Sequence, residues 1–516
     1  MRPNRKLAEA LKALKRLQDK HHGVIESGDL KEMHRAILVE EGFLLPAMKG
    51  WYICANPRDR EGGSTAWYAS FWSFLSGYLG KRFGKRYCLN VEASLLMHTR
   101  STVVPRQVTV IAREGGTSVL ALPHDTSLLI YPDDKNVPRN RVDVNGLQVL
   151  PLPETLCKLG PQAFRRHPRE AEIALSLIRD PAELLTVLLA GEGMAAAAGR
   201  LAGALGFVGR PDDAERIVRT MRQAKFDIRV SNPFGIPAPT VGLSRERSPY
   251  VLRLQSMWAG WREDVLALFP PPPGLPSSAK AYLASVAERY RADAYNSLSI
   301  EGYQVDDALI ERVAGKGWNP ERDEQDRRDR DALAARGYYQ AFQAVKTSLA
   351  EILSGENPGR VAGAGHHRWY GELFAPAVAL GILEPHHLAG YRNGPVYIRN
   401  SMHTPLPRDA LADAMEALID LLVLEPEPAV RAVIGHHLFV FIHPYFDGNG
   451  RIGRFLMNAM LASGGYPWTV IRMKRRDAYM RALESASTGG DIKPLARFIA
   501  EEMREWEPGK PARRKR

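Results

Sequence analysis

Residues 443–454 read HPYFDGNGRIGR, and this stretch with its flanks decides how the C-terminal half of the chain folds. Upstream, an apolar periodic segment begins at Pro428, a residue suited to a first helical turn, and Pro444 ends it. Downstream of Gly450, apolar residues recur at helical spacing as far as Gly464. The sequence therefore predicts two helices joined by a glycine-rich loop.

The residue types of this loop suit a phosphate group. Gly448 and Gly450 permit backbone conformations closed to other residues, so that successive N–H groups can converge on one anion. The second helix adds unpaired N–H groups and the positive end of its dipole. Arg451 and Arg454 are three residues apart, on adjacent parts of one helix face, and their guanidinium groups could hold two different phosphates.

Two further residues supply a metal ligand and a base. Asp447 offers a hard oxygen ligand for Mg²⁺, an ion that typically also takes phosphate oxygens and water. His443, at the other end of the loop, has an ordinary pKa of about 6.5 and can accept a proton at neutral pH. These features do not by themselves distinguish AMP transfer from phosphoryl transfer.

The loop resembles the signature of the Fic (Fido) family, His-Pro-Phe-x-(Asp/Glu)-Gly-Asn-Gly-Arg-x-x-Arg. Every fixed position matches except Tyr445, where the family usually has phenylalanine. The resemblance to the catalytic domain covers roughly residues 278–505. It implies protein AMPylation, in which AMP from ATP is transferred to a Ser, Thr or Tyr hydroxyl of a target protein or of the enzyme itself, with release of pyrophosphate.

The resemblance also implies a role for each matching residue. His443 would be the general base on the incoming hydroxyl, and Asp447 would bind the Mg²⁺ that bridges the α- and β-phosphates. Arg451 would contact the β-phosphate region and Arg454 the γ-phosphate. The anion hole would be formed by Gly448, Asn449 and Gly450, with Asn449 on the phosphates.

Residues 297–302, SLSIEG, are similar to the inhibitory motif of the family, (Ser/Thr)-x-x-x-Glu-(Gly/Asn), with Ser297, Glu301 and Gly302 at its fixed positions. Glu301 would end a helix, where a carboxylate is poorly placed with respect to the dipole and needs a cationic partner. The resemblance implies that this partner is Arg454, which would be drawn away from the γ-phosphate. The enzyme would then be held inactive by its own glutamate.

Two accessory features match the family as well. Residues 390–398, followed by His403-Thr404-Pro405, look like the β-hairpin flap that holds the target segment by main-chain pairing. The alternation of Val396, Tyr397 and Ile398 suits β-addition to an extended peptide, although a plain loop is the alternative. Tyr479 resembles a tyrosine of the closing helix that can approach the adenine, and helix packing is the alternative for it.

Residues 1–57 predict two helices followed by two short strands around Gly50, which is the order of a winged helix. Residues 42–57, GFLLPAMKGWYICANP, resemble the winged-helix head of AbiEi-type antitoxins, which are DNA-binding regulators. The resemblance continues loosely into residues 58–230. It implies DNA as a partner of the head, and a docking or packing domain without a role in DNA binding is the alternative.

The predicted fold is multidomain: an all-α Fic domain with a small β-hairpin flap at the C-terminus, preceded by a winged-helix unit and a mixed α/β region. The α/β region covers residues 58–230, and a Pro-rich linker that could hold one helix at 250–269 covers 231–277. The Fic domain with its inhibitory helix covers 278–507, and a basic tail covers 508–516.

The composition indicates which partners and which cellular compartment to expect. The 516 residues carry a formal net charge of +12, of which five charges lie in the tail, and this favours anionic partners such as nucleotides or nucleic acid. The three cysteines are far apart and form no CxxC pair, which fits a reducing compartment. No apolar run reaches the roughly 18 residues of a membrane helix. We therefore expect a cytoplasmic protein with no membrane partner.

The sequence thus predicts an autoinhibited, Mg²⁺-dependent protein adenylyltransferase with ATP and a hydroxyl-bearing protein as its partners, and a homo-oligomer stays open. One alternative is another Fic chemistry, such as removal of AMP or transfer of a different nucleotide or phosphate group. The other alternative is a DNA-binding transcriptional regulator whose Fic domain only senses a ligand.

Overall fold

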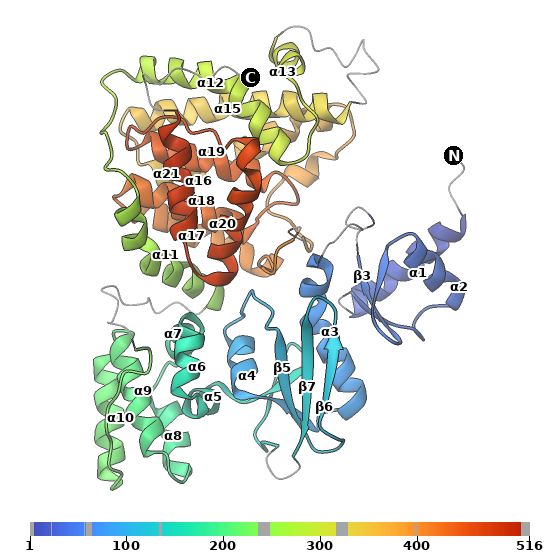
Figure 1. The fold of residues 1–516 in the computed structure, drawn as a ribbon, viewed down its shortest axis with the longest axis vertical. Helices are drawn as coiled ribbons and strands as arrows, with labels where there is room; N and C mark the ends of the chain where they lie inside the picture. Colours follow the sequence, from blue (N-terminus) through green and yellow to red (C-terminus); the bar gives the residue numbers. More distant parts are fainter. Residues whose placement is uncertain are drawn as a thin grey trace. The chain divides into compact units, whose positions relative to one another are not determined.

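The computed structural model describes residues 5–21, 23–55, 57, 64–133, 137–235, 248–315, 329–396, 398 and 400–506. Helices dominate the described residues (Figure 1). The chain divides into two compact units: unit 1 comprises residues 1–256 and 397–404, and unit 2 comprises residues 257–396 and 405–516. None of the described helices is both long and apolar enough to cross a membrane.

Unit 1 begins with a small head that has its own apolar core. Its elements are α1 (Arg5–His21), β1 (Val24–Glu26), α2 (Glu32–Glu40), β2 (Leu44–Met48) and β3 (Trp51–Cys54). The strands form an antiparallel sheet of order β1-β3-β2, and the turn between β2 and β3 contains Gly50 at φ 84°. A single helix, α2, lies between β1 and β2, where a helix-turn-helix needs two helices. The winged-helix assignment of residues 1–57 therefore stays a prediction.

A four-stranded sheet and the helices packed on it form the centre of unit 1. The strands are β4 (Tyr87–Leu89), β5 (Gln107–Ala112), β6 (Ser118–Leu122) and β7 (Thr126–Pro132). Their order is β4-β5-β7-β6; β5 and β7 run parallel, and the other neighbours are antiparallel. Trp67 and Phe71 of α3 (Thr65–Phe83) share a buried cluster with Val108 and Ile130 of the sheet. This arrangement agrees with the mixed α/β structure expected for residues 58–230.

The remainder of unit 1 is mainly helical. It contains α4 (Val91–His98), β8 (Val142–Val144), β9 (Leu147–Val149), α5 (Leu152–Lys158), α6 (Pro161–Arg166), α7 (Pro168–Leu177), α8 (Ala182–Ala190), α9 (Ala195–Phe207) and α10 (Pro211–Gln223). Helices α5 to α10 surround a second core of leucine, alanine and phenylalanine side chains. Gly199 and Gly203 of α9 allow the backbone at Arg229 and Ser231 to pass directly against the helix, because a Cβ at either glycine would collide with it.

Unit 1 also includes residues 397–404, which interrupt unit 2 in the sequence. His403 forms an isolated antiparallel bridge with Val103, and the N–H of Thr404 donates to the carbonyl of Thr102 at 2.8 Å. No strand ladder is formed by the described residues between 390 and 405, so the predicted β-hairpin is not present there. A hairpin of this length is marginal without a third strand, and Pro395 lacks the N–H that a ladder needs.

Helix α11 (Pro249–Leu268) forms within the segment predicted as a linker. A helix was expected at these positions. From Met257 onward, however, α11 belongs to unit 2 and does not form a flexible linker between domains. Trp258 and Trp261 are buried, and the indole N–H of Trp258 donates to Glu425 at 3.1 Å. Arg262 forms an ion pair with the same carboxylate, also at 3.1 Å. The linker prediction for residues 231–277 is therefore wrong for this helix.

Unit 2 is a bundle of helices around a central pair. The helices after α11 are α12 (Ala279–Ile300), α13 (Asp307–Ala314), α15 (Arg330–Leu353), α16 (Pro358–Ala379), α17 (Leu411–Leu424), α18 (Pro428–Ile442), α19 (Asn449–Ala462), α20 (Arg476–Gly489) and α21 (Lys493–Arg504). The central pair, α18 and α19, is buried along nearly its whole length, with the other helices around it (Figure 1). The expected all-α architecture is present in this unit.

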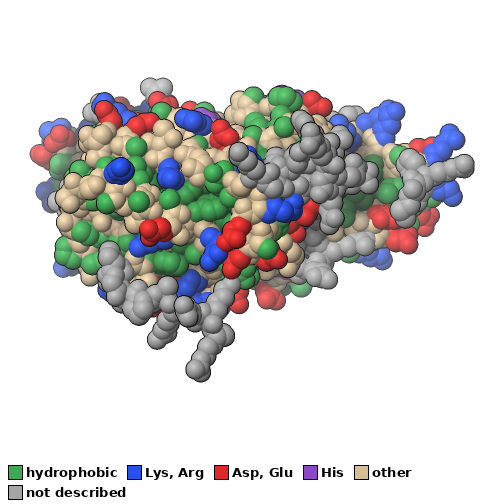
Figure 2. Space-filling view, turned by 90° about the horizontal axis from the view of Figure 1, so that it is seen from above, with side chains coloured by type: hydrophobic (Ala, Val, Ile, Leu, Met, Phe, Trp, Pro, Cys, Tyr) green, Lys and Arg blue, Asp and Glu red, His purple; other side chains and the backbone are tan. Residues whose placement is uncertain are grey.

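The surface charge is mixed on the face drawn in Figure 2. Lysine and arginine side chains stand among aspartate and glutamate side chains there, without one area of a single sign.

Candidate active site

The loop between α18 and α19 has the predicted helix–loop–helix form. Helix α18 ends at Ile442, and His443 follows in the left-handed region at φ 56° and ψ 59°. Helix α19 begins at Asn449, directly after Gly448 at φ 82°. Residues with a side chain rarely adopt positive φ, so the conformation of His443 must be held by its surroundings.

His443 is arranged to accept a proton through one ring nitrogen. Its Nδ1 lies 3.2 Å from the carbonyl oxygen of Val440, which can only accept, so Nδ1 carries the hydrogen and Nε2 is left as the basic nitrogen. Burial lowers the pKa of His443 to about 4, with a smaller contribution from the nearby Arg392 cation. The ring is therefore neutral at physiological pH, as a general base must be.

The start of α19 presents free backbone donors. The N–H groups of Asn449, Gly450 and Arg451 make no hydrogen bond within the described part of the chain. They are the orphan donors of a helix N-terminus and can bind an anion. The side chain of Asn449 is used differently from the prediction: it accepts the N–H of Tyr445 at 2.9 Å and donates to the carbonyl of Tyr445 at 2.7 Å. Asn449 thus closes the loop with its side chain, and its N–H is the group left for phosphate.

Arg451 is buried between two aromatic rings. Its guanidinium carbon lies 5.2 Å from the ring centre of Tyr303 and 5.3 Å from that of Phe374, and its side chain is 1% exposed. One nitrogen lies 3.2 Å from a carboxylate oxygen of Asp447. The Nε donor makes no hydrogen bond within the described residues. A buried, unpaired donor is costly, so the site is ready for an anionic ligand such as phosphate.

Asp447 fits the role of a magnesium ligand that acts together with a phosphate. Its side chain is 60% exposed at the mouth of the loop, and it accepts the N–H of Gly448 at 2.6 Å. Burial alone would raise the pKa of Asp447, but the Arg451 cation and this N–H outweigh it and lower the pKa. Within the described residues, no group of three or more histidine, cysteine or acidic side chains could hold a metal alone. A metal here would need oxygens from the nucleotide and water.

The structure brings the predicted inhibitory residues against Arg454. Oε1 of Glu301 accepts from Nη2 of Arg454 at 2.7 Å. Ser297, one turn earlier on α12, accepts from Nε of Arg454 at 2.9 Å through its hydroxyl and from Nη2 at 3.1 Å through its carbonyl. Gly302 at φ 87° turns the chain away directly after the helix. Burial alone would lower the pKa of Arg454, but the Glu301 carboxylate outweighs it and raises the pKa.

Glu301 also covers the start of α19. A Cβ added at Gly450 would collide with Oε1 of Glu301 and would lie 3.1 Å from Nη1 of Arg454. The carboxylate therefore lies close to Gly450 in the first turn of α19 as well as to Arg454.

Tyr445 has a partner that the sequence did not indicate. Its hydroxyl lies 3.0 Å from Nδ1 of His367, and its ring stacks on Tyr370 with centroids 3.8 Å apart and planes 6° apart. The hydroxyl that separates this residue from the usual phenylalanine is therefore satisfied inside the protein. His367 is 78 positions away in the chain, and only the fold pairs the two.

Tyr479 is a packing residue in this structure and does not offer its ring to an adenine. Its side chain is 1% exposed, and its hydroxyl lies 2.7 Å from Nε2 of His436. The ring stacks on Phe498 with centroids 5.7 Å apart. The alternative of helix packing is correct for Tyr479, because α20 turns this face toward the core.

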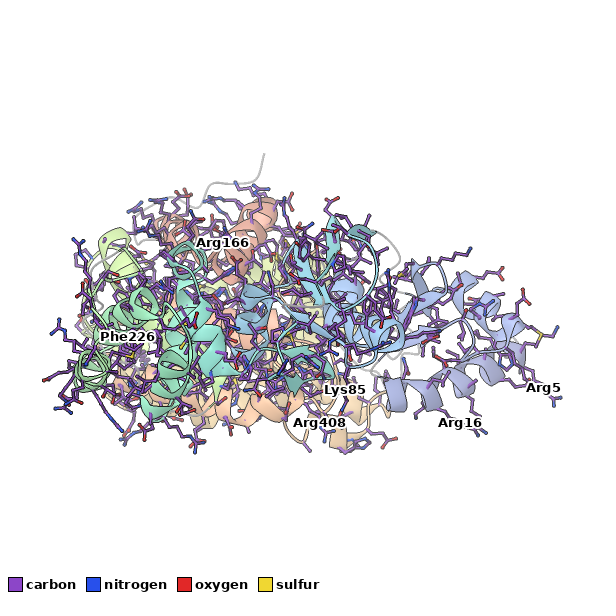
Figure 3. The ribbon with its side chains drawn as sticks, turned by 90° about the horizontal axis from the view of Figure 1, so that it is seen from below. Arg5, Arg16, Lys85, Arg166, Phe226 and Arg408 are labelled. Atoms are coloured by element: carbon purple, nitrogen blue, oxygen red, sulfur yellow. The ribbon has the colours of Figure 1, made fainter. Side chains whose placement is uncertain are left out.

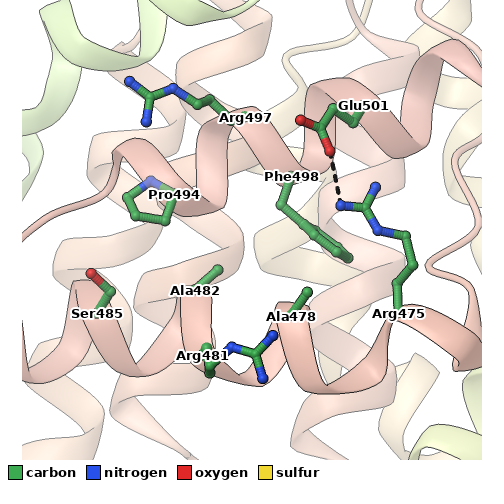
Figure 4. Close-up of a pocket in the computed structure, with 9 residues that line it drawn as sticks. All are labelled: Arg475, Ala478, Arg481, Ala482, Ser485, Pro494, Arg497, Phe498 and Glu501. Atoms are coloured by element: carbon green, nitrogen blue, oxygen red, sulfur yellow. Dashed lines mark hydrogen bonds and ion pairs between the residues drawn. The ribbon is translucent and has the colours of Figure 1, made fainter.

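Figure 4 shows a groove of about 390 Å³ between α20 and α21 that contains none of the predicted site residues. Its floor includes Phe498, over which Arg475 lies with its guanidinium carbon 4.6 Å from the ring centre. Arg475 is neutralised by Glu501 at 2.8 Å and Glu502 at 2.9 Å. The groove is therefore separate from the chemistry of the loop after α18.

The flap region contributes a residue that sequence reasoning missed. Val396 and Ile398 are half-buried, while Tyr397 lies outside the described residues. Arg392, at the start of this region, is 4% exposed, and its Nε donates to the carbonyl of His443 at 2.7 Å. Arg392 can be recognised as a basic residue in the sequence. No local pattern, however, predicts that its partner is the carbonyl of His443, 51 positions away.

Taken together, these residues form a helix–loop–helix that combines a neutral histidine, one exposed carboxylate and unbonded N–H groups at a helix N-terminus. Residues 377–461 match the model of the Fic/DOC family, and the chain therefore carries a Fic domain in unit 2.

Two curated relatives illustrate the match. Over 125 residues the chain is 40% identical to Protein adenylyltransferase Fic of Nematostella vectensis, covering 23% of this chain and 29% of that protein. Over 126 residues it is 37% identical to Protein adenylyltransferase Fic of Drosophila willistoni, covering 24% of this chain and 25% of that protein. The chain thus spans less than a third of the length of these relatives.

Solved structures with Fic domains are more distant. Fic-1 from C. elegans is 18% identical, with a TM-score of 0.35 over 68% of this chain and 88% of that one. A Fic domain containing signaling protein from Bacteroides thetaiotaomicron is 18% identical, with a TM-score of 0.33 over 49% of this chain and 93% of that one.

Proposed function

We propose that this protein is an autoinhibited protein adenylyltransferase, which transfers AMP from ATP to a Ser, Thr or Tyr hydroxyl of a target protein or of itself. The observation that supports it best is the loop after α18, where Nε2 of His443 makes no hydrogen bond within the described residues and the start of α19 offers N–H groups and Arg451 to phosphates. The relatives named above carry this activity in their names.

The reaction follows from these positions. His443 takes the proton of the incoming hydroxyl, whose oxygen attacks the α-phosphorus of ATP. The bond between the α-phosphorus and the bridging oxygen breaks, and pyrophosphate leaves. Asp447 would hold a Mg²⁺, which would supply neutralisation of the phosphate charge. Arg451 and the N–H groups of Asn449 and Gly450 stabilise the charge on the phosphate chain.

The regulatory part of the proposal concerns Glu301. Its carboxylate occupies Arg454 and covers Gly450, so ATP binds in a productive position only when Glu301 moves away. The free energy of a charge-assisted hydrogen bond, about 1.5–3 kcal/mol, is then an added cost of productive ATP binding.

Labelled ATP tests the reaction. The Glu301→Gly variant is incubated with Mg-ATP labelled at either the α- or the γ-phosphate. We expect the Glu301→Gly protein to incorporate the label of the α-phosphate and not the label of the γ-phosphate. The Glu301→Gly/His443→Ala variant should incorporate no α-label. Label from γ alone would show phosphoryl transfer. Release of AMP from a previously AMPylated protein, without α-label uptake, would show the removal reaction.

DNA binding by the head is a second candidate, and a charged helix face favours it. The exposed residues of α1 include five basic side chains: Arg5, Lys6, Lys12, Lys15 and Arg16. Arg5 and Arg16 extend from α1 in Figure 3. Helix α2, in contrast, exposes Glu32 and Glu40, which a DNA phosphate would repel. A gel shift of the full chain on duplex DNA, with and without Lys12→Glu/Arg16→Glu, tests the candidate, and binding should weaken steeply with salt.

The proposal also concerns the cellular compartment of the protein. Three described cysteines, Cys54, Cys88 and Cys157, are free and buried, which supports a reducing compartment such as the cytoplasm. Burial raises the pKa of the Cys54 thiol to about 11, so it stays protonated.

A further inference from the structure

We propose that Arg392 is a positioning residue that fixes the main chain of His443 relative to the flap region. The inference rests on the proposed function in two respects: it takes His443 as the base and residues 390–398 as the place where the target segment docks.

The contacts of Arg392 join three separate stretches of unit 2. Its Nε donates to the carbonyl of His443 at 2.7 Å, and its backbone N–H donates to the carbonyl of Pro444 at 2.9 Å. Its Nη1 donates to the carbonyl of Gly394 at 2.9 Å, and its Nη2 donates to the carbonyl of Leu406. One guanidinium thus ties the loop of the base to both ends of the segment that contains the flap.

The partners of this cation are unusual for a buried arginine. All its hydrogen-bond acceptors are backbone carbonyls, and no carboxylate pairs with it among the described residues. Burial lowers the pKa of Arg392 to about 10, so it is still charged at pH 7. A buried cation whose partners are all neutral is stable only while each acceptor keeps its position, because the loss of one acceptor leaves a buried N–H unpaired.

The backbone of His443 needs such a restraint. His443 lies in the left-handed region at φ 56°, which a residue with a side chain adopts only when its surroundings enforce it. Its carbonyl points to Arg392, while its Nδ1 is held by Val440. Because hydrogen bonds hold both the carbonyl and the ring of His443, the orientation of Nε2 is fixed. Because the same arginine holds Gly394, a hydroxyl docked at the flap arrives at a fixed place relative to Nε2.

Two substitutions in the Glu301→Gly background test the inference. Arg392→Met keeps the volume and removes all side-chain donors, and Arg392→Lys keeps the charge but has no planar fork to reach three carbonyls. We expect Arg392→Met to lower kcat for AMP transfer by about tenfold to a hundredfold, with the KM for ATP changed by less than about twofold. The kcat of Arg392→Lys should lie between that of Arg392→Met and that of the Glu301→Gly parent.

The pKa of His443, followed by NMR without ATP or metal, gives a readout independent of activity. The charged groups that act on its ring are Arg392, Glu301 and Asp447. Glu301 is absent from all variants compared, and Asp447 is unchanged in them. Removing the Arg392 cation should raise the pKa of His443, and Arg392→Lys should change it less.

Arg289 provides a matched control. It is another arginine of unit 2 whose acceptors are backbone carbonyls, those of Trp468 at 2.7 Å and Trp506 at 2.5 Å. Arg289→Met should lower thermal stability without changing kcat or the pKa of His443. If folded Arg392→Met matches Arg289→Met in both readouts, Arg392 is only structural and the inference is wrong. If Glu301→Gly transfers no AMP, the proposed function fails, but the pKa of His443 still decides the inference.

Discussion

Oε1 of Glu301 lies 2.7 Å from Nη2 of Arg454, although 153 positions separate the two residues in the chain. The same carboxylate lies against Gly450, at the start of the helix that carries Arg454. One acidic side chain is therefore paired with an arginine and also lies beside the first turn of the helix that carries that arginine. The predictions below follow from this relationship and from the groups around it.

Neutralising Glu301 should strengthen ATP binding. Glu301→Gln keeps the size of the side chain but replaces the ion pair with Arg454 by a hydrogen bond from the same cation to an uncharged amide oxygen, which is weaker by about 1–2 kcal/mol. Calorimetry of the full chain should show Mg-ATP binding tighter by about tenfold. The control is Glu311→Gln, because Glu311 pairs with Arg291 on the surface of the same unit. Equal affinities in Glu301→Gln and wild type would contradict the competition.

Gly450 and Glu301 should be coupled energetically. Gly450→Ala puts a methyl group into the Glu301 carboxylate, so it should destabilise the wild-type protein by about 1–3 kcal/mol in urea unfolding. In the Glu301→Gly background the carboxylate is gone and only the flexible end of Arg454, with Nη1 at 3.1 Å, must shift slightly, so alanine in a helix should be close to neutral. A double-mutant cycle measures the difference. Additive effects of the two substitutions would show that the carboxylate does not lie against Gly450.

Removing the hydroxyl of Tyr445 should affect stability more than chemistry. Tyr445→Phe leaves Nδ1 of His367 without its partner and should lower the free energy of unfolding by about 1 kcal/mol. The stacking on Tyr370 is kept, and the family signature itself has phenylalanine at this position. The rate of AMP transfer in the Glu301→Gly background should stay within about twofold of its parent. A large loss of rate with unchanged stability would assign the hydroxyl a part in catalysis.

The pH dependence of AMP transfer should reflect the neutral state of His443. Burial lowers its pKa to about 4, and a general base works only when it is deprotonated. The value of kcat/KM for the Glu301→Gly variant should therefore be flat from about pH 6 to 8 and should fall as the pH drops toward the pKa of the histidine. A fall centred near the ordinary histidine pKa of about 6.5 would mean that the ring is not desolvated in the enzyme.

The sequence was most informative where the relevant residues are neighbours. The loop at 443–454 and its two helices follow from glycine, proline and apolar spacing within a few turns, and the structure has them where expected. The contact of Glu301 with Arg454 was accessible only through resemblance to a family, because local spacing says nothing about residues so far apart. For Tyr479 the sequence left an adenine contact and helix packing open for the same reason: which side of α20 faces the core depends on α18 and α21.

Other features depend on long-range packing that no local pattern encodes. His367 and Arg392 stand out in the sequence only as ordinary polar residues, and their roles come from a hydroxyl and a carbonyl on the distant loop. Residues 390–398, followed by His403-Thr404-Pro405, match a flap by pattern, yet His403 pairs with Val103 in unit 1. A hairpin prediction cannot anticipate a bridge partner that lies 300 positions earlier in the chain.

The most direct test of the central claim is AMP transfer by full-length protein with α-labelled ATP and Mg²⁺, measured side by side for wild type, Glu301→Gly and Glu301→Gly/His443→Ala. The account predicts little label in wild-type protein, at least about tenfold more in Glu301→Gly, and none above background in the double variant. If Glu301→Gly incorporates no more label than wild type, or if the double variant keeps the activity of Glu301→Gly, inhibition by Glu301 or catalysis by His443 is contradicted.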